Sequence, residues 1–166
     1  MSTVAVANRC LLDSELERFA LGLAASRRRW ESLLPGASTD RSYALIASDE
    51  RVNAWAIRWG DDSDTGFHDH DGSAAGIAVI EGRVVEERLA LVGSPISRTF
   101  RAGQSFHLPG AAIHRVRHGG GRLALTVHAY SPPLFHQGVY RTDAHGALER
   151  TLALYTEELR AELAAA

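Results

Sequence analysis

Two histidines stand one residue apart in the stretch TGFHDHDGS, at positions 65–73. A neutral imidazole nitrogen is a good ligand for first-row transition metals. Side chains at positions i and i+2 of a β-strand project to the same face, so His68 and His70 could both point to one ion. The other interpretation is a pair of solvated histidines in a loop rich in aspartate and glycine. A metal site therefore needs a third ligand from elsewhere in the chain.

A second polar group lies on the predicted strand RLALTVHAY, at positions 122–130. Its residues alternate between an apolar set and a set that includes Thr126, His128 and Tyr130. If the polar face looks into a barrel, Thr126 can hold one imidazole nitrogen of His128 while the other nitrogen meets the hydroxyl of Tyr130. The alternative is a half-exposed edge strand whose polar face meets solvent.

Short strands dominate the segment that must position these groups. Alternating or β-branched runs, separated by Gly, Asp, Ser and Pro, predict a β-barrel over about residues 41–142. Apolar spacing predicts N-terminal helices within residues 11–34, and composition predicts a C-terminal helix over about residues 147–164. Helices do not interleave with the strands, which favours a sandwich or small barrel over a βαβ sheet. We expect a single, mainly β domain over residues 1–166.

Composition narrows the function classes. The chain has 166 residues and a net charge of −2, with 45% hydrophobic and 23% charged residues, which suits a globular domain with its own core. The near-neutral charge argues against nucleic-acid binding, and no apolar run has the length of a membrane span. Cys10 has no second cysteine to pair with and no signal peptide is evident, so we expect a reducing cytoplasm. The oligomeric state stays open.

Two longer spacings resemble the two motifs of the cupin superfamily, whose barrel is a double-stranded β-helix, or jelly roll. The segment HDHDGSAAGIAVIEG, which ends at Gly82, resembles the first motif. Gly103, Pro109 and His114 resemble the second. The resemblance implies that His114 is the third metal ligand.

The implied site has three neutral ligands. Cupins commonly place a glutamate ligand shortly after the second histidine of the first motif, where this chain has Ala74 and Ala75. Three imidazoles leave a divalent ion its full charge and up to three open coordination positions. A thiolate substrate would compensate that charge well, because a metal deprotonates a bound thiol.

The three histidines and the segment HAYSPP, at positions 128–133, together resemble the cysteine dioxygenase family of thiol dioxygenases over roughly residues 43–135. These cupins bind Fe(2+) through three histidines, so the resemblance implies iron at this site. It also implies that Thr126, His128 and Tyr130 form the counterpart of a Ser-His-Tyr relay, with threonine in place of serine. Animal members link their tyrosine to a cysteine; Ala75 stands at that position, so Tyr130 should carry no crosslink.

The chain departs from the family at the residue that binds the substrate carboxylate. Cysteine-using relatives have an arginine two residues after an upstream tyrosine, whereas Leu45 follows Tyr43 at that spacing here. A carboxylate in a partly dry pocket favours a bidentate guanidinium. Arg41, Arg58 and Arg141 are the candidates for this role, and each also fits an ordinary surface or structural arginine.

The resemblance implies an oxidoreductase, a non-haem Fe(2+) thiol dioxygenase that converts a small thiol and O2 to a sulfinic acid. Cysteine is the default substrate, and 3-mercaptopropionate, cysteamine or a larger thiol stay open because the family arginine is missing. Two other classes also stay open: a cupin isomerase or hydrolase that uses the ion as a Lewis acid, and a non-catalytic small-molecule sensor. In the dioxygenase, Tyr130 would donate a hydrogen bond to bound oxygen or thiolate.

Overall fold

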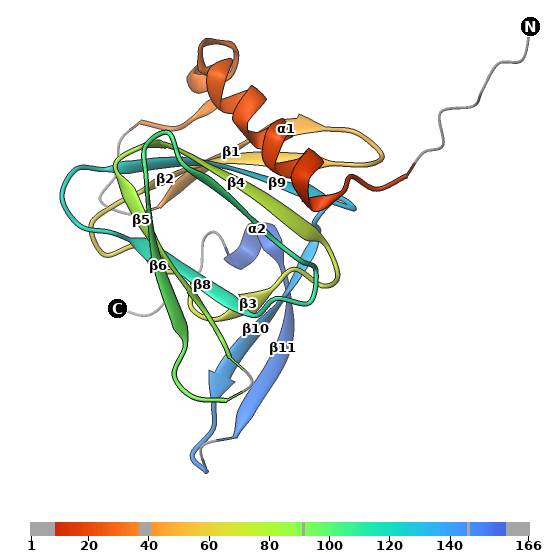
Figure 1. Ribbon diagram of the computed structural model, residues 1–166, viewed down its shortest axis with the longest axis vertical. Coiled ribbons are helices and arrows are strands. Elements are labelled where there is room, and N and C mark those ends of the chain that lie inside the picture. Colours follow the sequence, from red (N-terminus) through yellow and green to blue (C-terminus); the bar gives the residue numbers. More distant parts are fainter. Residues whose placement is uncertain (1–8, 37–40, 91, 146, 159–166) are drawn as a thin grey trace, which may run out of the picture.

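Two antiparallel sheets face each other in the computed structural model, which describes residues 9–36, 41–90, 92–145 and 147–158 (Figure 1). The five-stranded sheet has, in spatial order, β1 (Ser42–Ser48), β2 (Asn53–Trp59), β9 (Ala124–Ser131), β4 (Ala74–Glu81) and β7 (Ser105–Leu108). The six-stranded sheet has, in spatial order, β11 (Leu148–Leu154), β10 (His136–Thr142), β3 (His68–Asp69), β8 (His114–His118), β5 (Arg83–Arg88) and β6 (Ile96–Arg101).

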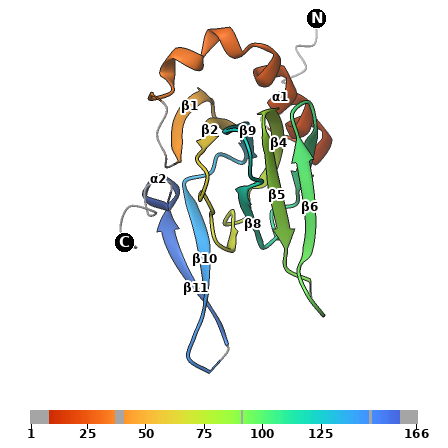
Figure 2. The same ribbon diagram turned by 90° about the vertical axis from the view of Figure 1, so that its left-hand side faces the viewer.

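Helix α1 (Asp13–Ala25) and two short 3-10 turns (Arg27–Arg29 and Glu31–Leu33) lie within the segment whose apolar spacing predicts helices. Figure 2 shows α1 along the outer side of the five-stranded sheet. A Cβ at Gly76 of β4 would lie 2.4 Å from the carbonyl carbon of Leu16, so glycine permits this close approach. None of the helices in the described ranges is long and apolar enough to cross a membrane.

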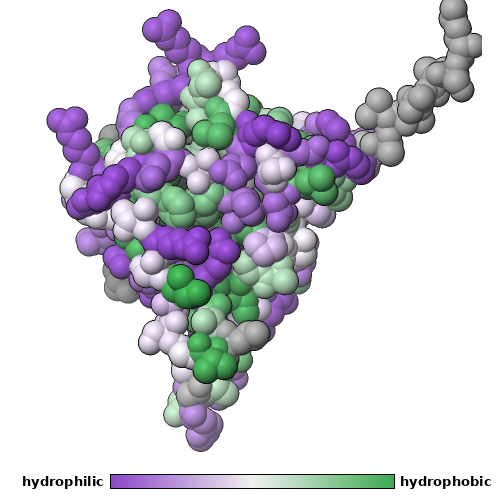
Figure 3. Space-filling view, viewed as in Figure 1, coloured by the Kyte–Doolittle hydropathy of each residue, from purple (hydrophilic) through white to green (hydrophobic). Residues whose placement is uncertain are grey.

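Alternation along β9 divides the core into two parts. Leu125, Val127 and Ala129 point away from the barrel and pack in the cluster beneath α1. The intervening residues, among them Thr126 and Tyr130, are buried on the face that looks into the barrel. Hydrophilic residues cover much of the outer surface seen in Figure 3, with apolar residues in its middle and toward its lower end.

The C-terminal segment corrects one prediction. Leu148–Leu154, expected to be helical as part of residues 147–164, form β11, which pairs with β10 along its whole length. Among the described residues of this segment, Tyr155–Glu158 form a helix, the short α2, and residues 159–164 lie outside the described residues. Helix propensity is a weak preference, and the interstrand hydrogen bonds of a hairpin outweigh it here. The hairpin extends beyond the barrel and returns α2 to it (Figures 1 and 2).

Candidate metal centre and its surroundings

Strand register brings the three predicted ligands together. His68 on β3 is the cross-strand partner of His114 on β8, and His70 follows two residues after His68. The three ring centroids lie 4.5 to 5.2 Å apart. One ring nitrogen from each histidine lies within 4.8 Å of the other two, and all three side chains are buried. We refer to these residues as the three-histidine centre.

Hydrogen bonding indicates which nitrogens face this centre. Nδ1 of His68 lies 3.1 Å from the carbonyl oxygen of Gly66, which only accepts, so Nδ1 carries the proton and Nε2 keeps a lone pair. Nε2 of His70 and Nε2 of His114 lie 3.3 Å apart. Their Nδ1 atoms have no hydrogen-bond partner within the described part of the chain. A cation between these nitrogens would bind a lone pair from each ring once the protons lie on Nδ1.

Burial keeps the three imidazoles neutral. It lowers the pKa of His68 to about 4 and the pKa values of His70 and His114 well below the ordinary 6.5. Neutral imidazole is the form that binds a metal. Oε1 of Glu86 lies 3.8 Å from Nδ1 of His114, the ring nitrogen opposite to Nε2. The donor set therefore fits a first-row divalent ion held by nitrogen alone.

Strand β9 of the opposite sheet presents the expected polar relay. Oγ1 of Thr126 lies 2.9 Å from Nε2 of His128, and Nδ1 of His128 lies 3.2 Å from the hydroxyl of Tyr130. The Tyr130 ring meets the His70 ring edge-on, with a centroid separation of 4.9 Å. The relay therefore ends beside the three-histidine centre.

Donor capacity gives this relay a direction. The indole Nε1 of Trp59 donates to Oγ1 of Thr126 at 2.8 Å, because an indole N–H cannot accept. The Thr126 hydroxyl then donates to Nε2 of His128, since its other acceptor, the carbonyl of Ile57, is 3.5 Å away. Burial lowers the pKa of His128 to about 3, so its single ring proton lies on Nδ1 and is donated to Tyr130. The hydroxyl proton of Tyr130 is left available for another acceptor.

A second phenol, which the sequence did not reveal, meets Tyr130. The hydroxyl of Tyr155 in α2 lies 3.1 Å from that of Tyr130, and the Tyr155 ring packs edge-on against Tyr130 and Trp55, each at 5.5 Å. Burial raises the pKa of Tyr155 to about 12 and that of Tyr130 well above 10, so both phenols are neutral. Composition predicts a C-terminal helix over the segment that contains Tyr155, so the sequence gives no cue that this ring enters the barrel.

His68 of the centre and two residues of the relay, His128 and Tyr130, line one narrow cavity. Its free volume is about 20 Å³, room for roughly one water molecule. Its wall includes Arg41, His68, Tyr130, Gln137 and Tyr155. A ligand larger than water therefore requires a wall residue to move.

The three arginine candidates lie in different places. Arg41, just before β1, lines the cavity, with its guanidinium carbon 5.8 Å from the ring centroid of Trp59. Strand alternation turns Arg58 to the outer face of β2, where it donates to the carbonyl of Pro35 at 2.7 Å. Arg141 is exposed toward the far end of β10, beyond the barrel. The structure therefore brings Arg41 to the site, and it places Arg58 and Arg141 away from it.

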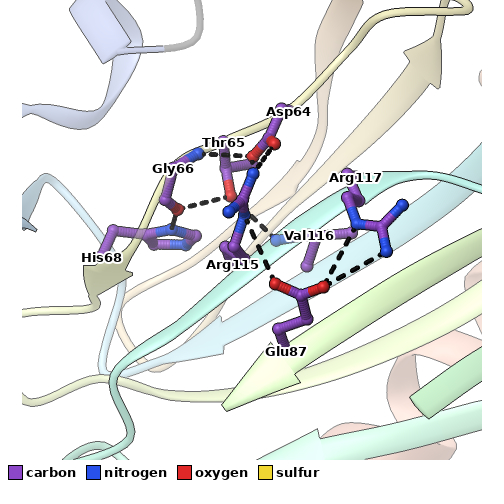
Figure 4. A network of polar contacts seen from close by, with 8 residues as sticks. All are labelled: Asp64, Thr65, Gly66, His68, Glu87, Arg115, Val116 and Arg117. Atoms are coloured by element: carbon purple, nitrogen blue, oxygen red, sulfur yellow. Dashed lines mark hydrogen bonds and ion pairs between the residues drawn. The ribbon is translucent and has the colours of Figure 1, made fainter. Parts of the chain in front are cut away.

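A surface network braces the segment that leads into β3 (Figure 4). Asp64 pairs with Arg115 of β8, and Glu87 of β5 pairs with both Arg115 and Arg117. Thr65 and Val116 exchange two hydrogen bonds of 2.9 Å. These contacts hold the backbone next to the carbonyl that orients His68.

Asp69, between two of the histidines, ties β3 to the C-terminal hairpin. Its carboxylate accepts two hydrogen bonds from Arg150 of β11, at 2.7 and 2.9 Å, and one from the hydroxyl of Tyr140 at 2.6 Å. Burial alone would raise the pKa of Asp69, but the hydrogen bonds from these two residues hold it below its ordinary value. A Cβ at Gly138 would lie 2.2 Å from Nε of Arg150, so glycine leaves room for the pair.

Comparison with solved structures establishes the class of fold. The TT1209 structure from Thermus thermophilus is 19% identical, with a TM-score of 0.54 over 62% of this chain and 93% of that one. A double-stranded β-helix protein from Klebsiella pneumoniae is 13% identical, with a TM-score of 0.54 over 75% of this chain and 86% of that one. KdgF from Halomonas sp. is 15% identical, with a TM-score of 0.51 over 60% and 86% of the two chains. The protein has the cupin double-stranded β-helix fold.

The family follows from the sequence match. Residues 30–143 match the cysteine dioxygenase type I family, and the chain belongs to that family. No curated protein matches the chain. Membership and the three-histidine centre together support a metal-dependent enzyme of the oxidoreductase type.

Proposed function

We propose that this protein is a thiol dioxygenase that uses Fe(2+) and O2 to oxidise a small thiol, cysteine by default, to its sulfinic acid. The observation that carries the proposal is a buried centre of three neutral imidazoles, one of which, His68, lines the same cavity as Tyr130. Membership in the cysteine dioxygenase type I family supports the same reaction. Because a free thiol persists in a reducing compartment, we also propose that the enzyme works in the cytoplasm.

The three-histidine centre would hold the ion through its Nε2 atoms. Ferrous iron, when bound there, would supply the redox chemistry of the oxidation. Both oxygen atoms end on sulfur, which loses the four electrons that O2 gains, so no external reductant is required. The neutral histidines add no negative charge, and a thiolate then compensates the charge of the ion.

Residues of the opposite wall bind and orient the substrate. Tyr130, which accepts from His128, donates its hydroxyl proton to the thiolate or to an oxygen atom that gains negative charge. Arg41 binds the substrate carboxylate in place of the arginine that other family members carry after their tyrosine. This assignment rests on the position of Arg41 in the wall of the cavity.

The test is oxygen uptake by the protein after anaerobic loading with Fe(2+). Cysteine, 3-mercaptopropionate, cysteamine and glutathione form the substrate panel, and the sulfinic acid is quantified by mass spectrometry. We expect one O2 consumed per sulfinic acid formed. Iron binding without oxygen uptake for any thiol would instead favour Lewis-acid catalysis or a sensor.

A further inference from the structure

Gln137 of β10 brings a carboxamide to the cavity that forms no hydrogen bond with any other described residue. The residue is 4% exposed. The amide atoms of Gln137 are not among the fully buried, unpaired polar atoms of the described residues, so they are open to the cavity. A carboxamide that faces a cavity and forms no hydrogen bond with other described residues can bind a ligand there.

Strand pairing sets the direction of this side chain. Val139 of β10 is the cross-strand partner of His68, and Gly138 is the partner of Asp69. Residues directly opposite in an antiparallel pair project to the same face, and residues two apart share a face. Gln137 therefore projects to the same side as Val139 and His68, into the barrel.

Most other polar groups in the wall already have partners. Hydrogen bonds within the protein engage Thr65, His128, Tyr130 and Tyr155. Arg41 contributes positive charge and donors, whereas Oε1 of Gln137 is an acceptor that the protein does not use. A ligand that matches this wall has an anionic group for Arg41 and a hydrogen-bond donor for Gln137.

We propose that Gln137 is a specificity-determining residue whose Oε1 accepts a hydrogen bond from the amino group of a thiol that also carries a carboxylate. This inference rests on the proposed thiol oxidation and narrows it to amino-acid thiols. A thiol without an amine, such as 3-mercaptopropionate, offers no donor to Oε1 of Gln137.

Gln137→Met tests the assignment, because methionine keeps the length of the side chain and removes its hydrogen-bonding capacity. In the iron-loaded enzyme we expect kcat/KM for cysteine to fall roughly ten- to hundredfold, the loss of a hydrogen bond to a charged group. The value for 3-mercaptopropionate should stay within about twofold. An equal fall for both thiols would overturn the proposal. Gln104→Met, on an exposed turn, is the matched control and should change neither value.

Two further measurements do not depend on turnover. The ligand-free Gln137→Met variant should melt no lower than the wild type, because the carboxamide that it loses forms no hydrogen bond with other described residues. Under anaerobic conditions, cysteine should raise the melting temperature of the iron-loaded wild type more than that of the variant. Lower melting of the ligand-free variant, or equal stabilisation by cysteine, would overturn the role of Gln137. Failure of wild type to oxidise any thiol would refute the proposed function instead.

Discussion

Tyr130 accepts a hydrogen bond from His128, so its own hydroxyl proton can be donated to Tyr155 or to a ligand in the cavity. Tyr130→Phe removes that donor and leaves the three-histidine centre intact. We therefore expect normal iron content and a loss of kcat of roughly a hundredfold or more, as for other donors that act on developing negative charge. Metal analysis and oxygen uptake check both parts. Tyr43→Phe, whose hydroxyl lies outside the relay, should keep the wild-type rate, and a Tyr130→Phe enzyme as fast as wild type would exclude the donor role.

His114 supplies one of three nitrogens to the proposed ion. Loss of a residue that hydrogen-bonds to a metal ligand typically lowers metal affinity roughly 10- to 100-fold. His114→Ala removes a ligand itself, so we expect a larger loss of Fe(2+) affinity. Anaerobic metal titration measures this change. His107→Ala is the matched control, because His107 is half-exposed and contacts Glu17 on the outer side of the barrel. Equal affinities for the two variants would place the ion elsewhere.

The β10–β11 hairpin is held to the ligand strand by Asp69 and Arg150. Arg150→Met leaves the carboxylate of Asp69 buried with fewer donors, and we expect a loss of about 1–3 kcal/mol in the free energy of unfolding. This value is modest because Arg150 itself is partly exposed. Urea denaturation measures the loss. Arg141→Met on the same hairpin should change stability by less than about 0.5 kcal/mol, and equal effects at the two positions would show that the ion pair contributes nothing.

Helix α2 matters to the site because it places Tyr155 in the wall of a cavity of about 20 Å³. Tyr155→Ala removes a buried ring and should cost about 2–4 kcal/mol of stability. It should also raise kcat/KM for glutathione relative to cysteine, since the cavity becomes larger. Oxygen uptake with the two thiols checks this ratio. Tyr155→Phe keeps the ring. If the kcat/KM ratio of glutathione to cysteine shifts equally in both variants, the size of the cavity does not determine which thiol is used.

The protein as a whole carries four buried histidines with lowered pKa values, His68, His70, His114 and His128. In the unfolded chain these groups take up protons near pH 6.5, whereas in the folded metal-free protein they stay neutral to lower pH. The unfolded state then binds more protons, so stability is present above pH 6.5 and is lost as the pH falls toward about 4. The shift of His68 alone corresponds to about 3 kcal/mol.

Urea midpoints of the metal-free protein at pH 7 and pH 5 test this dependence. We expect a lower midpoint at pH 5 and an unchanged denaturant slope. Bound Fe(2+) should raise the midpoint at pH 7 and steepen its fall, because protons compete with the metal for the same nitrogens. A midpoint that does not change between the two pH values would mean that these imidazoles are not buried and neutral.

Much of the site could be predicted from local spacing. The two-residue period of a strand places Thr126, His128 and Tyr130 on one face, and the same period directs His68 and His70 together. These relations hold wherever the strand lies in the fold. The barrel follows from similar alternation in many short runs, and the motif spacings around Gly103 and His114 indicate its family.

Other features depend on contacts between distant parts of the chain. Local composition predicts a helix at Leu148–Leu154, but pairing with β10 makes that segment a strand and brings Tyr155 into the cavity. The three arginines look alike in the sequence, and only packing separates Arg41 in the wall from the other two. The unused carboxamide of Gln137 likewise becomes evident when every neighbour is in place. Such properties depend on many contacts between residues far apart in the sequence. The two-residue period of a strand, by contrast, can be read from neighbouring residues alone.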